Sequence, residues 1–125
     1  MNSIHEICKQ YEIENYTINP DGSIDVDGDV YLCNKGLTEL PLVFNKVSGN
    51  FDCGDNNLTT LKGSPRWISG DFYCDDNDLT DNYCDTEIGG YFYTSLKQDG
   101  LTEVNYNEWR KLYKRKLILN DIFNM

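Results

Sequence analysis

The sequence predicts an α/β fold: a short solenoid with one small parallel sheet, a helix and hairpin capping its N-terminal end, and a helix capping its C-terminal end. A repeat of about 21 residues carries this prediction, because residues 30–37, 51–58 and 72–79 align with one another. Predicted strands start at spacings of 21, 21 and 20 residues, and a glycine follows two residues after each start. These starts are Val26, Val47, Ile68 and Ile88. The constant spacing indicates that successive repeats stack as coils.

Within each repeat, apolar and variable residues alternate as in a half-buried strand, for example in Phe51-x-Cys53 and Phe72-x-Cys74. The two cysteines occupy the position that Leu32 fills one repeat earlier, so we expect them to pack in the core as small hydrophobic residues. The chain has five cysteines, an odd number that argues against a disulfide framework and favours free thiols. The cysteines are Cys8, Cys33, Cys53, Cys74 and Cys84.

An asparagine follows two of these strands, Asn56 in one repeat and Asn77 in the next. The chain must turn at this position, where backbone groups would otherwise lack partners. A buried asparagine amide can bond both carbonyl and amide groups of neighbouring coils. We therefore expect both asparagines to have a structural role.

The other residues of the same strands point away from the core and form the candidate binding surface. This surface is acidic and aromatic, and tyrosines supply rigid contact area at protein interfaces. Tyrosines also favour strands without any partner, so a purely structural role is the alternative. The candidate partner-binding residues are Asp29, Tyr31, Asn50, Asp52, Asp71, Tyr73, Asp75, Tyr91 and Tyr93.

The residues from Phe51 to Leu61 follow the pattern apolar-x-apolar-x-x-Asn-x-Leu-x-x-Leu, which resembles the leucine-rich repeat. Residues 37–41 resemble its short bacterial variety, and residues 47–65 resemble repeat proteins of bacteriophages and some bacteria. The resemblance covers residues 16–95 and implies a curved stack with a parallel sheet on its concave side. It also implies a role in protein–protein binding, with no shared catalytic residues. Lys35 departs from the pattern by replacing the asparagine of the first repeat, and Asp81 and Tyr83 interrupt the third.

The chain is predicted to be a single domain, residues 1–125, with an N-terminal cap (1–29), repeats (30–95) and a C-terminal helical cap (96–125). Ser3 is expected to cap a helix that extends to about Tyr11, and residues 16–18 and 24–26 to form a hairpin. The C-terminal helix is expected to start at Asn105 or Asn107. Its apolar stripe comprises Tyr106, Trp109, Leu112, Tyr113, Leu117 and Phe123.

The net charge of −10 disfavours direct nucleic-acid binding and favours a protein partner with a basic surface. Residues 1–104 carry 19 acidic and 6 basic side chains, whereas residues 105–125 carry 2 and 5. The basic face of the C-terminal helix is either a solvated surface or a second contact site. It consists of Arg110, Lys111, Lys114, Arg115 and Lys116.

No motif in the sequence predicts a catalytic residue, a cofactor or a metal site. The single histidine, His5, has no nucleophile motif around it, so the chain is not expected to be an enzyme. Two Asp-rich stretches suggest calcium: Asp25, Asp27 and Asp29, and the cluster Asp75, Asp76 and Asp78. An EF-hand that starts at Asp25 would, however, place Val30 and Gly36 where glycine and glutamate are required. Calcium binding therefore remains a minor alternative.

No apolar run reaches the roughly 18 residues of a membrane span, and the N-terminus lacks the apolar stretch of a signal peptide. We expect a cytoplasmic protein without membrane contacts, located in the host cytoplasm if it is phage-encoded. The sequence predicts no particular oligomeric state.

These patterns favour a non-catalytic protein–protein recognition module. The resemblance suggests a phage-encoded protein that binds and inhibits a host defence or nucleic-acid enzyme. The main alternative is an acidic nucleic-acid mimic that occupies a basic channel of such an enzyme. A structural or oligomerising role is a lesser alternative.

Overall fold

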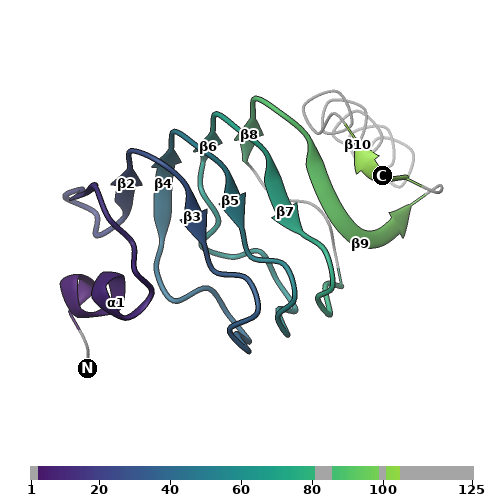
Figure 1. Cartoon of the computed structure of the whole chain (residues 1–125), viewed down its shortest axis with the longest axis horizontal. Helices are drawn as coiled ribbons and strands as arrows, with labels where there is room; N and C mark the ends of the chain where they lie inside the picture. The colour runs from purple at the N-terminus through teal and green to yellow at the C-terminus, as the bar shows by residue number, and fades with distance from the viewer. Residues whose placement is uncertain (1–2, 81–85, 99–100, 105–125) are drawn as a thin grey trace, which may run out of the picture.

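The computed structural model describes residues 3–80, 86–98 and 101–104, which form a solenoid of stacked coils with helix α1 at one end (Figure 1). Each coil contributes one strand to each of two sheets, and a hairpin adds a fifth, antiparallel strand to each sheet. The first sheet contains, in spatial order, β1 (Tyr16–Ile18), β2 (Ile24–Val26), β4 (Phe44–Val47), β6 (Trp67–Ile68) and β8 (Glu87–Ile88). The second contains β10 (Leu101–Val104), β9 (Phe92–Gln98), β7 (Phe72–Cys74), β5 (Phe51–Asp52) and β3 (Val30–Tyr31).

The predicted repeat spacing is confirmed by the strand register. In the first sheet Val26 pairs with Val47, Val47 with Ile68, and Ile68 with Ile88, at offsets of 21, 21 and 20 residues. All of these pairings are parallel, as predicted. The spacing seen in the sequence is therefore the length of one coil.

The prediction of one sheet was wrong, because each coil turns a corner between two strands. Val26, Val47, Ile68 and Ile88 end the strands of the first sheet and do not begin strands. A glycine lies at each corner, and the backbone of Gly70 bonds Gly49 of the preceding coil with an N···O distance of 3.0 Å. A methyl group at Gly70 would collide with the side-chain oxygen of Asn50 and lie 2.9 Å from the Gly49 carbonyl oxygen. Glycine at this position allows the coils to stack closely.

A column of phenylalanines fills the core between the two sheets. Phe51 packs edge-on against Phe44 and Phe72, with ring centroids 5.0 and 5.5 Å apart, and Phe72 also contacts Phe92 at 5.3 Å. All four side chains are fully buried, and burial of each contributes about 1.5–3 kcal/mol. Leu32, Cys53 and Cys74 are also fully buried, which confirms the prediction that these cysteines pack in the core.

The predicted structural role of the asparagines is confirmed. The Nδ2 group of Asn56 donates to the carbonyl oxygens of Leu32, Cys53 and Gly54. Its Oδ1 atom accepts from the backbone amides of Lys35 and Leu37. Asn77 repeats this arrangement one coil later, where its Oδ1 accepts from the amide of Leu58. Each asparagine thus joins its own coil to the preceding one.

The N-terminal cap also forms as predicted. Helix α1 (Ile4–Gln10) is capped by the Ser3 hydroxyl, which accepts from the amide of Glu6 at 3.2 Å, and it buries Cys8 against the first coil. β1 and β2 form the predicted antiparallel hairpin, with Tyr16 opposite Val26.

The C-terminal cap, predicted to be helical over residues 96–125, contains strand in the part that the structure describes. β9 continues to Gln98, and β10 pairs with it antiparallel, with Val104 opposite Phe92. The sequence here includes Thr102 and Val104, and β-branched residues are enriched in strands. The helix predicted from Asn105 or Asn107, its basic face, and Asp81, Tyr83 and Cys84 lie outside the described residues.

Candidate partner-binding face

The outer face of the second sheet carries a row of three tyrosines and one aspartate, which we call the tyrosine row: Tyr31, Asp52, Tyr73 and Tyr93. Parallel pairing places each member opposite the next on the neighbouring strand. Tyr31 is 57% exposed, whereas the other three side chains are half-buried. The register of the coils therefore brings together side chains that are about 20 residues apart in the sequence.

The rings at one end of the row are held against each other. Tyr73 and Tyr93 stack with ring centroids 4.6 Å apart and planes 3° apart. Tyr91, which is 50% exposed, lies 6.5 Å from Tyr93 between ring centroids. The three rings form a continuous aromatic patch over the start of β9.

Two of the tyrosine hydroxyls are oriented by carboxylates at the corners. The Tyr31 hydroxyl donates to Asp29 Oδ2 at 3.1 Å, and the Tyr73 hydroxyl donates to Asp71 Oδ2 at 3.2 Å. The bond to Asp29 and its negative charge raise the pKa of Tyr31. The pKa of Tyr73 is raised mainly by burial and then by the charge of Asp71. Both phenols are therefore neutral hydrogen-bond donors at physiological pH.

Three of the predicted binding residues also bind the corners together, as a set that we call the corner ladder: Asp29, Asn50 and Asp71. Oδ1 of each accepts from the backbone amide of the equivalent residue in the next coil, at 2.7 to 2.8 Å. The last amide in this series belongs to Tyr91. The strand pattern in the sequence did not indicate this structural role. The recurrence of Asp, Asn and Asp directly after a glycine was the available signal.

The remaining acidic residues lie where the strands of the second sheet end. Asp52 Oδ1 accepts from the amide of Gly54, and Asp75 is half-buried. Asp55 and Asp76 occupy equivalent left-handed positions in successive coils, both with φ of 52°. The pKa of Asp55 is raised, first by its hydrogen bond with the Asp76 carboxyl and then by burial and the charges of its acidic neighbours. This edge of the face concentrates negative charge.

The aspartates of the first stretch that suggested calcium make separate hydrogen bonds. Asp25 Oδ1 accepts from Asn45 Nδ2 at 2.8 Å, and Asp27 Oδ1 accepts from the Ser48 hydroxyl at 2.9 Å. Asp29 belongs to the corner ladder. Within residues 3–80, 86–98 and 101–104, no three His, Cys, Asp or Glu side chains are grouped as metal ligands.

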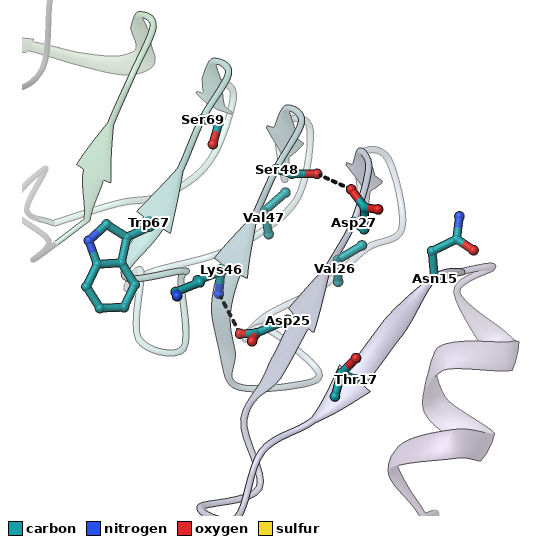
Figure 2. A pocket seen from close by; sticks show the side chains of 10 residues that line it. All are labelled: Asn15, Thr17, Asp25, Val26, Asp27, Lys46, Val47, Ser48, Trp67 and Ser69. Carbon is teal, nitrogen blue, oxygen red and sulfur yellow. Dashed lines mark hydrogen bonds between the residues drawn. The ribbon is translucent and has the colours of Figure 1, made fainter.

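The first sheet has a groove of about 250 Å³ on its outer face, which extends from Asn15 and Thr17 to Trp67 (Figure 2). Trp67 is 46% exposed, and the Lys46 ammonium lies 5.4 Å from the centroid of its ring. The pKa of Asp25 is lowered, mainly by hydrogen bonds from the amides of Asn45 and Asn19. Trp67 was not among the residues predicted to bind a partner, although its alternation with buried Ile68 indicated an outward side chain.

The described cysteines are either buried or have a raised thiol pKa. Cys53 and Cys74 are buried, and burial raises the pKa of the Cys8 and Cys33 thiols. Both of these thiols are therefore protonated at neutral pH. The exposed His5 lies 2.6 Å from the Tyr16 hydroxyl, measured from its Nδ1 atom.

Comparison of the chain with protein-family models, with curated proteins and with solved structures found no match. Among the residues that the structure describes, no helix is long and apolar enough to cross a membrane.

Proposed function

We propose that this chain is a non-catalytic recognition module that binds a protein partner through the tyrosine row. The observation that carries the proposal is the stacked pair Tyr73 and Tyr93 beside the half-buried Asp52. Tyrosines and a few fixed polar groups are typical of the central part of protein interfaces. The rings are already ordered, so binding loses little side-chain entropy.

The charge of this face favours a partner with a basic surface. Asp52 lies in the tyrosine row, and Asp75 and Asp55 extend the negative charge along the ends of the strands. Opposite charges on the partner would guide association and set its orientation. Following the resemblance to phage repeat proteins, we propose a host defence or nucleic-acid enzyme as the partner, which the chain inhibits by covering its surface.

A second candidate function is nucleic-acid mimicry, favoured by the adjacent carboxylates of Asp55 and Asp76. In this case many carboxylates would share the binding energy, and partner binding would weaken strongly with salt. In the favoured case one or two tyrosines would dominate.

The test captures partners from a bacterial host lysate with three tagged proteins at low and high salt. They are the wild type, the double variant Tyr73→Ala/Tyr93→Ala, and Trp67→Ala, which removes an exposed aromatic from the other sheet. A protein captured by wild type and Trp67→Ala, lost with the double variant and retained at high salt supports the proposal. Equal capture by all three contradicts it, and loss only at high salt favours mimicry.

A further inference from the structure

Strand β3 ends the second sheet, and β5 is its only partner strand among the residues that the structure describes. The amides of Val30 and Leu32 donate to the carbonyls of Asn50 and Asp52 across this pairing, at 2.9 and 2.7 Å. In a parallel ladder the intervening residue directs its backbone groups to the opposite side. The N–H and C=O groups of Tyr31 therefore face the free edge, where no backbone partner occurs among the described residues.

A hollow of about 180 Å³ lies beside this edge. Its walls come from the segment after α1, including Tyr11, Glu12 and Ile13, and from residues of the first coil such as Val30 and Tyr31. Ile13 and Val30 are buried core residues, so the inner wall is apolar. An extended chain at this edge would direct alternate side chains toward the apolar wall and toward the outer face.

The charges around the edge favour a basic ligand. Glu12 and Asp29 line the hollow, Asp52 lies next to Tyr31 in the row, and Lys35 is the one basic residue among those lining the hollow. A basic side chain opposite Tyr31 would contact both the exposed ring and the Asp29 carboxylate. A second copy of this acidic chain would bring like charges together, which disfavours edge-to-edge pairing of two copies.

We propose that the free edge of β3 binds an extended, basic peptide segment of the protein partner by strand addition, an inference that rests on the proposed function. The segment alternates basic residues on the outer face with apolar residues toward Ile13. Main-chain hydrogen bonds to Tyr31 supply affinity, and the flanking carboxylates supply specificity. The edge thereby extends the tyrosine row beyond Tyr31.

The test uses the synthetic heptapeptide Thr-Val-Arg-Val-Arg-Val-Thr as probe and measures binding by fluorescence anisotropy. The variant Tyr31→Pro removes the outward N–H, a change that an edge strand tolerates because this group lies outside the ladder. Tyr31→Ala is the matched control, because it removes the ring and keeps the N–H. We expect Tyr31→Pro to bind the peptide at least about fivefold more weakly than Tyr31→Ala does.

A second probe tests the wild-type protein directly. Peptides with N-methyl groups on alternate residues, made in both registers, cannot donate from one side of the strand. We expect methylation in one register to abolish binding of the peptide and methylation in the other register to leave binding intact. Bound peptide should also slow hydrogen exchange at the Tyr31 amide of the protein. This comparison remains decisive if Tyr31→Pro fails to fold.

Three results would overturn the inference: no peptide binding, equal binding of both methylated registers, or sedimentation showing a dimer that Tyr31→Pro dissociates. The capture experiment separates this outcome from failure of the proposed function. Capture that depends on Tyr73 and Tyr93 without peptide binding would remove the strand-addition inference alone. Failure of both experiments would remove both proposals.

Discussion

The rings of Tyr73 and Tyr93 lie parallel across neighbouring coils, with centroids 4.6 Å apart and planes 3° apart. The pairing of β7 with β9 places the two residues opposite each other, so the stack is part of the sheet. A partner would meet a surface that is already arranged for contact.

The Tyr93→Ala variant should lose this stack and expose more of Tyr73. We expect the free energy of unfolding to fall by more than about 0.5–1.5 kcal/mol, because an aromatic pair contributes that much in addition to the apolar area that it buries. Urea denaturation and near-ultraviolet circular dichroism provide the measurements. Tyr93→Phe is the control, since it keeps the ring, and a loss as large as that of Tyr93→Ala would show that ring stacking is not the source.

Asn56→Ala should be strongly destabilising. The side chain satisfies carbonyls and amides of two coils, and its loss leaves several buried polar groups without partners. Each such group costs about 1–3 kcal/mol, so we expect a loss of at least about 3 kcal/mol. The neighbouring exposed Asn57 gives the matched control, because Asn57→Ala should change stability by less than about 0.5 kcal/mol. Similar denaturation midpoints for the two variants would refute the structural role.

Gly70→Ala should destabilise the corner by about 1–3 kcal/mol, because its methyl group would force the coils apart. Differential scanning calorimetry measures the effect. The exposed Ser69 precedes it in the same corner, and Ser69→Ala should leave the melting temperature nearly unchanged. An unchanged melting temperature for Gly70→Ala would show that the coils are not closely packed there.

The acidic pair predicts a pH dependence. The folded-state pKa of Asp55 is raised, so its charged form is less favourable in the folded chain than in the unfolded chain. This penalty is present at neutral pH and disappears as the pH falls through the folded-state pKa to below the unfolded value of about 3.9. Asp55→Asn should therefore stabilise the protein more at pH 7 than at pH 3.

Asparagine also suits the left-handed backbone at position 55, as Asn34 shows in the first coil. This backbone effect on the free energy of unfolding is the same at both pH values. The measurement is the difference in unfolding free energy between variant and wild type at each pH. A difference that does not change with pH would contradict the account of the Asp55–Asp76 pair.

The sequence predicted the features that repeat along the chain. The coil length, buried Cys53 and Cys74, and the role of Asn56 all follow from residues that recur at one spacing, because stacked coils place equivalent residues in equivalent environments. The N-terminal helix and hairpin have ordinary capping and turn signals.

The features that the sequence did not predict depend on how the chain bends. A glycine corner divides each coil between two sheets, and the alternation of side chains on either side of it gives no sign of this bend. The same corner gives Asp29, Asn50 and Asp71 a role in backbone hydrogen bonding, whereas the strand pattern indicated only exposure. The stacking of Tyr73 on Tyr93 follows from register, but its geometry depends on side-chain rotamers.

The most direct test of the central claim places a benzoylphenylalanine photocrosslinker at position 73 or, as the control, at position 67 on the opposite sheet. Both positions are on outer faces, so only the location of the partner distinguishes them. If the partner binds through the tyrosine row, irradiation in host lysate gives one protein adduct from position 73 and none from position 67. An adduct from position 67 alone, or from neither position, would contradict binding through the tyrosine row.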